Sequence, residues 1–271
     1  MRIKDRINVN IDDHIATVTL SRAEKMNALD PAMFEAFPEV ADYLRGNTSV
    51  RVVILRAEGD HFCAGLDKSS IAGMMDMSGS NDASALKSLA TRTHGIANAP
   101  QFAAWMWREC EVPVIAAIKG VAFGGGLQIA LGADMRFVSP DASFSIMELK
   151  WGIVPDMSST QIMRHLVRDD VIRELTYTAR VFNAEDALNW GFVTAIVDDP
   201  YAHALDVART IVDKNPVAVR SAKRIIDKAN YQSQAEGLLY ESEQQDQIIG
   251  SANQIEAIQA QLEQRTPEFS D

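Results

Sequence analysis

Runs of apolar residues predict the strands of this chain. Apolar and polar residues alternate over 7–11 and again over 14–20, on either side of the turn signal Asp12-Asp13. This alternation predicts a β-hairpin that opens the fold. Two nearly continuous apolar runs, 50–57 and 114–121, predict strands that are buried on both faces.

Helical signals surround and follow these strands. Asp30 is a favoured N-cap, and Pro31 follows at the first helical position, so a helix is expected to run toward residue 46. Pro38 lies inside that helix and is expected to kink or split it. Beyond residue 200 the pattern is helical throughout and ends in one long helix that reaches about Gln264. We therefore divide the chain into a core, 1–199, and a helical C-terminal region, 200–271, which packs on the core or on another subunit.

Each of the two buried strands ends at a turn that contains glycine. The first reaches Ala64-Gly65, and the second reaches the triplet 124–126 within KGVAFGGGLQIALG, residues 119–132. Glycine permits positive φ and a close approach of a ligand to the backbone. The start of the following helix presents unpaired N–H groups and a partial positive charge. This arrangement favours binding of an oxygen that carries negative charge; the alternative is a tight turn with no ligand.

Composition narrows the class of protein. The net charge is -11 and the pI is near 4.9, which argues against nucleic acid or an anionic membrane as the main partner. The two cysteines, Cys63 and Cys110, form neither a disulfide framework nor a metal-binding pattern. The N-terminus has no apolar stretch typical of a signal peptide, and no apolar run is long enough to span a membrane. We expect a soluble cytoplasmic protein without a metal ion.

Two segments together resemble the crotonase superfamily, the enoyl-CoA hydratases and isomerases. They are HFCAGLD, which ends at Asp67, and KGVAFGGGLQIALGADMRF, residues 119–137. SRAEKMNAL, FSIMELKWGIVPD and ALNWGFVTAIV add support in the expected order. The resemblance implies an α/β fold, a spiral of ββα units with a helical C-terminal region, assembled as a homotrimer or a hexamer. It also implies an acyl-CoA thioester as ligand, with no separate cofactor because coenzyme A is part of the substrate.

The resemblance also implies where the thioester lies. Its oxygen would sit between the backbone N–H groups of Leu66 and Gly125, which form an oxyanion hole that stabilises a thioester enolate. The rest of the substrate site would be lined by residues of three short segments: Lys25, Met26, Ala64, Asp67, Lys68, Ser69 and Gln128.

The proton-carrying residues match the family only in part. Hydratases of this family use two glutamates, and Gln128 stands where the first is expected, whereas Glu148 matches the second. Members that resemble dienoyl-CoA isomerases place a glutamate and an aspartate eight residues apart, as Glu148 and Asp156 are. The alternative for Asp156 is a structural role as N-cap of a helix over 157–167. Apolar neighbours at 151–154 are expected to bury Glu148 and raise its pKa.

We favour an isomerase that shifts a carbon–carbon double bond with Glu148 and Asp156 as its catalytic residues. Two alternatives stay open. One is an enoyl-CoA hydratase, a lyase, that relies on Glu148. The other is an inactive acyl-CoA-binding protein that kept the fold after losing the first glutamate.

Overall fold

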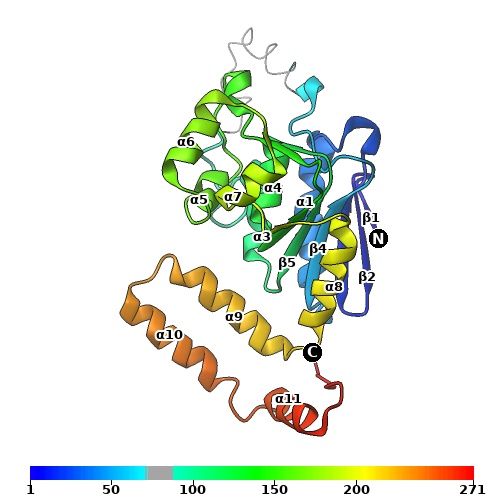
Figure 1. Cartoon of the computed structure of the whole chain (residues 1–271), viewed down its shortest axis with the longest axis vertical. Helices are drawn as coiled ribbons and strands as arrows, with labels where there is room; N and C mark the ends of the chain where they lie inside the picture. Colours follow the sequence, from blue (N-terminus) through cyan, green and yellow to red (C-terminus); the bar gives the residue numbers. More distant parts are fainter. Residues whose placement is uncertain (71, 73–87) are drawn as a thin grey trace.

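The computed structural model describes residues 1–70, 72 and 88–271, and its centre is a seven-stranded sheet (Figure 1). The strand order is β1-β2-β3-β4-β5-β7-β10, antiparallel from β1 to β3 and parallel from β3 onward. The bounds are β1 Arg2–Ile3, β2 Ile7–Asp12, β3 Ile15–Leu20, β4 Val52–Ala57, β5 Val114–Ile118, β7 Met135–Val138 and β10 Ala195–Ile196. A smaller sheet, in the order β6-β8-β9, contains β6 Val121–Phe123, β8 Ser143–Ser145 and β9 Phe182–Asn183. The predicted opening hairpin and the α/β fold class are confirmed.

Helices cover both faces of the large sheet. On one face, alternate residues such as Val53 and Leu55 join a core with α1, Pro31–Arg45, α3, Ala99–Glu109, and α4, Gly125–Gly132. On the other face, Val52 and Ile54 pack with α8. Burial on both faces of the sheet explains why β4 is almost continuously apolar. Before the last three helices of the chain, the described residues also form α5 Ser159–Met163, α6 Asp169–Thr178, α7 Ala184–Trp190, α8 Pro200–Val212 and the 3-10 helices η1 Ala23–Lys25 and η3 Glu148–Trp151.

The strand expected over 114–121 is in fact two strands in two sheets. β5 ends at Ile118 and β6 begins at Val121, with Gly120 between them at a φ of 56°. A Cβ on Gly120 would lie 2.2 Å from the carbonyl oxygen of Asp60, so only glycine fits this junction. The chain thus leaves the large sheet just before the glycine triplet. The apolar pattern did not reveal the break because the residues on both sides of it are apolar.

Two other helices differ from what was expected. Pro38 was expected to kink or split its helix, and it does not split it: α1 runs from Pro31 to Arg45 without a break, with Asp30 as its N-cap, whose side chain accepts from Met33 N. The long C-terminal helix is divided into α10, Gln234–Asp246, and α11, Ala252–Glu263. α10 ends at Asp246 with Gln247 as its C-cap, Gly250 in the connection has a φ of 77°, and Ser251 caps the next helix.

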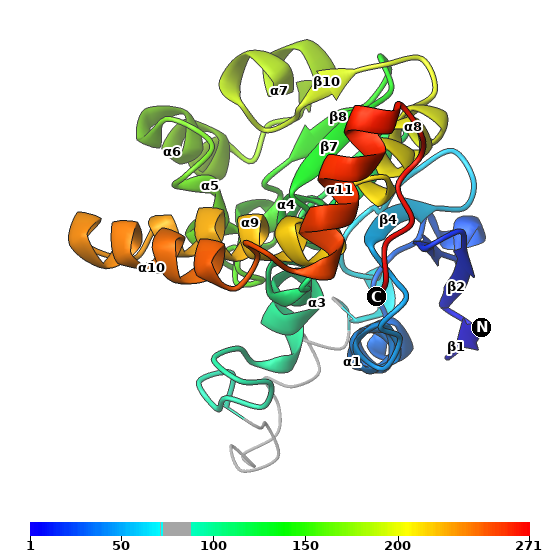
Figure 2. The ribbon, with the colours of Figure 1, turned by 90° about the horizontal axis from the view of Figure 1, so that it is seen from below.

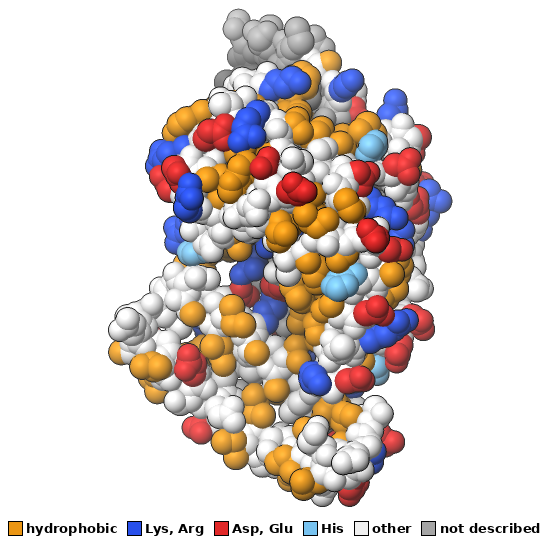
Figure 3. All heavy atoms as spheres, in the orientation of Figure 1, with side chains coloured by type: hydrophobic (Ala, Val, Ile, Leu, Met, Phe, Trp, Pro, Cys, Tyr) orange, Lys and Arg blue, Asp and Glu red, His pale blue; other side chains and the backbone are white. Residues whose placement is uncertain are grey.

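The last three helices extend away from the sheet (Figures 1 and 2). α9, Pro216–Ala229, is anchored to the core by Lys223, whose Nζ contacts Trp107 O at 3.1 Å and Asp134 Oδ2 at 2.8 Å. Apolar side chains are exposed along α10 and α11, including Leu238, Leu239, Ile255, Ile258 and Leu262, and Figure 3 shows apolar groups over this part of the surface. The division of the chain at residue 200 stays a prediction, and α8, just beyond it, packs on the sheet. Within the described residues, no helix is long and apolar enough to cross a membrane.

Candidate active site

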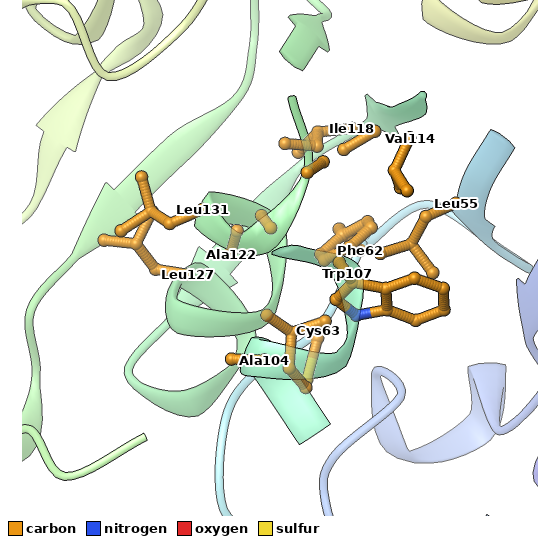
Figure 4. Close-up of a cluster of buried hydrophobic side chains, with 14 of the residues drawn as sticks. Leu55, Phe62, Cys63, Ala104, Trp107, Val114, Ile118, Ala122, Leu127 and Leu131 are labelled. Atoms are coloured by element: carbon orange, nitrogen blue, oxygen red, sulfur yellow. The ribbon is translucent and has the colours of Figure 1, made fainter. Parts of the chain in front are cut away.

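The two glycine turns lie against each other. Cys63 pairs with Ala122 in a parallel bridge, and Phe123 N donates to Cys63 O over 3.0 Å. A Cβ on Gly65 would lie 2.7 Å from Phe123 O, and a Cβ on Gly126 would lie 2.3 Å from Cys63 O. Glycine is therefore required at both turns by close backbone packing. Behind them, Leu127 and Leu131 of α4 point into a cluster of apolar side chains (Figure 4).

This packing leaves two backbone N–H groups available for a ligand. Gly125 is the first residue of α4, where an N–H has no partner inside the helix. Leu66 pairs with Leu29 in a parallel bridge. The hydrogen bonds of this bridge are made by Gly65 O and Asp67 N, so they do not use the Leu66 N–H. Among the described residues, no acceptor receives a hydrogen bond from either Leu66 N or Gly125 N. A Cβ on Gly65 would lie 3.6 Å from Gly125 N, so the two turns that carry these donors adjoin.

Glu148 lies next to the glycine triplet. Glu148 is only 6% exposed, and a Cβ on Gly124 would lie 3.3 Å from Glu148 Oε1. Oε1 accepts from Gln128 Nε2 over 2.6 Å, whereas Oε2 is buried and has no hydrogen-bond partner among the described residues. Burial raises the pKa of Glu148, and the charge of Asp156 raises it further. One carboxylate oxygen is therefore fixed, and the other is left to accept a proton.

The source of this burial differs from the expectation. Trp151 and Val154 are 47% and 67% exposed, so these sequence neighbours do not bury the carboxyl group. The carboxyl group lies against the glycine turn instead, since a Cβ on Gly124 would approach both its Oε1 and its Cδ. The 3-10 helix that begins at Glu148 ends at Gly152, which directs 151–154 outward.

Gln128 is oriented by the segment that follows Asp156. It is 2% exposed, and its Oε1 accepts from Met157 N at 2.9 Å and from Ser159 N at 3.3 Å. Two backbone donors on Oε1 fix which way the amide points, so Nε2 must face Glu148. Gln128 therefore joins α4, Glu148 and the loop at 156–159 in one hydrogen-bonded unit.

Asp156 does not cap a helix. α5 begins at Ser159, and its N-cap residue, Ser158, has a φ of 75° and makes no side-chain cap. Asp156 is instead half-buried at the edge of a pocket of about 270 Å³, beside Gln101 and Trp105. Burial raises the pKa of its carboxyl group. The structure thus brings Glu148 and Asp156 close enough for their charges to interact, despite the glycine and proline between them.

The remaining predicted site residues lie along two adjacent segments, 25–26 and 64–69. Ala64 N donates to Met26 O over 2.9 Å, which places the loop at 25–26 beside the segment 64–69. The side chains of Lys25, Met26, Lys68 and Ser69 are exposed there. Asp67 differs, because its carboxylate is engaged by Ser69 and by Arg22. Arg22 was missed from the sequence, since only the fold brings it next to Asp67.

Comparison with known proteins identifies the family. A family model described as enoyl-CoA hydratase/isomerase matches residues 10–271. The chain belongs to this family. It is therefore an acyl-CoA-processing enzyme of the enoyl-CoA hydratase/isomerase family, and the resemblance to the crotonase superfamily is confirmed.

Individual relatives include both kinds of enzyme. The chain is 31% identical to a peroxisomal Delta(3,5)-Delta(2,4)-dienoyl-CoA isomerase of Arabidopsis thaliana, covering 97% of this chain and 95% of the relative. It is 30% identical to a mitochondrial methylglutaconyl-CoA hydratase of Mus musculus, covering 94% and 79%. The solved enoyl-CoA hydratase of Bacillus anthracis superposes with a TM-score of 0.86 at 29% identity, covering 97% and 98%. These names do not fix the reaction or the compartment, and a cytoplasmic location stays a prediction.

Proposed function

We propose that this enzyme shifts carbon–carbon double bonds of an unsaturated acyl-CoA, with Glu148 and Asp156 as its two proton-carrying groups. The observation that supports this proposal is the pair itself. Two carboxyl groups with raised pKa values interact beside the glycine turns, while the neighbouring position 128 carries an amide. Burial of both carboxyl groups, with a smaller contribution from the charge of Asp156 on Glu148, favours the state in which the pair holds one proton, so that one member is a base and the other an acid.

The chemistry requires two carboxyl groups when the carbon that loses a proton and the carbon that gains one are several bonds apart. One carboxylate takes a proton from the carbon next to the thioester carbonyl, and the electron pair moves onto the carbonyl oxygen. Leu66 N–H and Gly125 N–H stabilise that charge. As the enolate collapses, the other carboxyl group gives its proton to a distant carbon. In a 3,5-dienoyl to 2,4-dienoyl conversion, the proton leaves C2 and another arrives at C6, four bonds away, which one carboxyl group does not reach.

The exposed loops supply a place for coenzyme A. We assign this role to the segment of Lys25 and Met26 and to the segment of Ala64, Lys68 and Ser69, with Gln128 beside the acyl group. Asp67 belongs to the second segment, but only its backbone is available to a ligand, because its carboxylate is engaged by Arg22 and Ser69. Lys25 and Lys68 carry exposed ammonium groups that suit phosphates. Coenzyme A would then run over the surface from these loops to the two N–H donors.

We also propose that the chain forms a homotrimer or a hexamer. The exposed leucines and isoleucines of α10 and α11 support a partner surface of the same kind, because a large apolar surface is costly to leave in water. Sedimentation velocity at micromolar concentration should give a mass of three or six chains, and a monomer throughout would contradict the proposal.

Hydration of an enoyl-CoA is the second candidate. The unpartnered Oε2 of Glu148 favours it, since this oxygen can activate a water molecule without help from Gln128. Hydratases are also among the similar proteins. The third candidate, an acyl-CoA-binding protein without turnover, is favoured by the missing carboxylate at Gln128.

One experiment separates the three candidates. The protein is incubated in heavy water with a panel of enoyl-CoA and 3,5-dienoyl-CoA thioesters, and the products are analysed by mass spectrometry. Isomerisation leaves the substrate formula unchanged apart from exchanged deuterium, whereas hydration adds the mass of a water molecule. Binding without any change in mass would support the third candidate and refute the proposal.

A further inference from the structure

An ion pair lies directly behind the turn that carries Leu66. Arg22 Nη1 donates to Asp67 Oδ2 over 2.6 Å, and the two side chains are only 13% and 11% exposed. The same Nη1 donates to Ala28 O over 2.9 Å. The other oxygen of Asp67, Oδ1, accepts from Ser69 N at 2.8 Å and from Ser69 Oγ at 2.6 Å. Both carboxylate oxygens are therefore engaged, and neither is left for a ligand.

The backbone next to this ion pair determines where the Leu66 N–H points. Leu29 N donates to Gly65 O over 2.8 Å, and Asp67 N donates to Leu29 O over 2.9 Å. These two bonds bracket Leu66, and successive peptide groups of extended backbone face opposite sides. The Leu66 N–H must then point away from Leu29. Its direction depends on Asp67 staying in register with Leu29.

The charges of Asp67 and Arg22 stabilise the position of the Leu66 turn. The hydroxyl and N–H groups of Ser69, followed by Arg22, hold the pKa of the Asp67 carboxyl well below its usual range. The carboxylate therefore stays ionised at neutral pH. Arg22 Nε also lies 3.6 Å from Asp30 Oδ2, which Arg6 Nη2 contacts at 2.7 Å. Arg22 is thus held between two carboxylates, one at the start of α1 and one at the Leu66 turn.

We propose that the Arg22–Asp67 ion pair is a positioning device that aims the Leu66 N–H at the thioester oxygen; this rests on the proposed function. Both are positioning residues, because each acts through the backbone and neither contacts the reacting atoms. A tilted Leu66 N–H would weaken the hydrogen bond most where negative charge develops on the oxygen. Loss of the pair should therefore lower kcat more than it lowers acyl-CoA affinity.

The test uses two variants and a matched control. Asp67→Asn keeps an acceptor for Ser69 but removes the charge, and Arg22→Lys keeps the charge but loses the planar fork. Arg6→Gln breaks the neighbouring ion pair with Asp30 and is the control. The direct readout is the infrared carbonyl frequency of bound hexanoyl-CoA, labelled with ¹³C at the thioester carbonyl, which has no double bond to react. Turnover and binding are measured in parallel.

In the wild type, the bound carbonyl should absorb at lower frequency than in solution, because two donors polarise it. In Asp67→Asn, the carbonyl frequency should return part of the way toward its value in solution. The kcat should fall roughly ten- to a hundredfold, less than the loss of about 10²–10³-fold in kcat that removal of a whole donor causes. The Kd for acyl-CoA should change less than about threefold. Arg22→Lys should show a smaller effect in the same direction, and this variant serves if Asp67→Asn does not fold. Variants with the wild-type frequency, or an equal change in Arg6→Gln, would overturn the positioning role. A wild-type carbonyl that does not shift would instead reject the oxyanion hole itself.

Discussion

Replacing Asp156 by Asn should abolish double-bond migration while leaving the fold intact. The substitution preserves shape and removes only the ability to carry a proton. Asp156 caps no helix and belongs to none of the ion pairs among the described residues, so little structure depends on its charge. Loss of a general acid–base group typically costs about 10²–10⁴-fold in rate, which is about 2.7–5.4 kcal/mol of activation free energy at ~1.36 kcal/mol per factor of ten.

Stability and pH dependence supply internal checks on the same variant. Because burial raises the pKa of Asp156, the folded state binds the proton more tightly than the unfolded state does. The stability contributed by protonated Asp156 is present below the unfolded pKa and is lost as the pH rises through the folded pKa. Asp156→Asn should therefore match the wild-type Tm at acidic pH and equal or exceed it at neutral pH. The pKa of Glu148 should fall, because the charge of Asp156 no longer raises it.

The assay compares Asp156→Asn with Asp141→Asn, which alters an exposed carboxylate away from the site. Initial rates of diene absorbance change give kcat and KM across pH, and acyl-CoA binding is measured separately by calorimetry. We expect a loss of kcat with a nearly unchanged Kd, and no effect in the control. Full isomerase activity in Asp156→Asn would refute the two-carboxylate mechanism and leave Glu148 to act alone.

Three further predictions concern the glycine turns and Gln128. In Gln128→Glu, one carboxylate oxygen should keep the two backbone donors while the other faces Glu148. Repulsion between the two carboxylates should then raise one pKa of the pair. The pH–rate profile should move upward and hydrated product should appear by mass; an unchanged profile would contradict the geometry. Gly125→Pro should lower kcat about 10²–10³-fold because it removes one oxyanion donor. Any Cβ at this position would lie 2.8 Å from Leu29 Cδ1 and 2.9 Å from Met157 Sδ, so Gly125→Ala, which adds the Cβ but keeps the N–H, is the control. Equal rates in the two variants would argue against the donor. Gly126→Ala should lower stability by about 1–3 kcal/mol through its clash with Cys63 O, whereas Gly237→Ala, in open space within α10, should stabilise by about 0.5–1 kcal/mol in thermal unfolding. A tolerated Gly126→Ala would show that the turns are not closely packed.

The sequence predicted correctly those helices and strands that are determined by residues close together in the chain. The opening hairpin depends on alternation, and the cap at Asp30 depends on a side chain that bonds three residues along the chain. The break at Gly120 was missed because its cause is Asp60, a residue sixty positions earlier. The break at Gly250 was missed for a different reason, since a glycine in a polar helical pattern is a weak signal until its φ is known.

The candidate site shows the same division. The resemblance to the family predicted Leu66 and Gly125 from their places in the glycine turns, and Glu148 and Asp156 from their match to the family pattern and their separation of eight residues. The sequence did not reveal what surrounds them. Glu148 lies against the glycine turn, whereas Trp151 is exposed. The cation that holds Asp67 is Arg22, which lies forty-five positions away.

The two hydrogen bonds that Gln128 accepts from Met157 N and Ser159 N have an evolutionary consequence. Those donors hold an amide oxygen, and they would hold a carboxylate oxygen at the same place equally well. The codons for glutamine and glutamate differ by a single base in the first position. A point mutation can therefore exchange a neutral side chain for an acidic one in this site without rebuilding the loop that supports it. The backbone of 157–159 would let descendants of this gene test a second carboxylate beside Glu148 in one step, with the donors for it already in place.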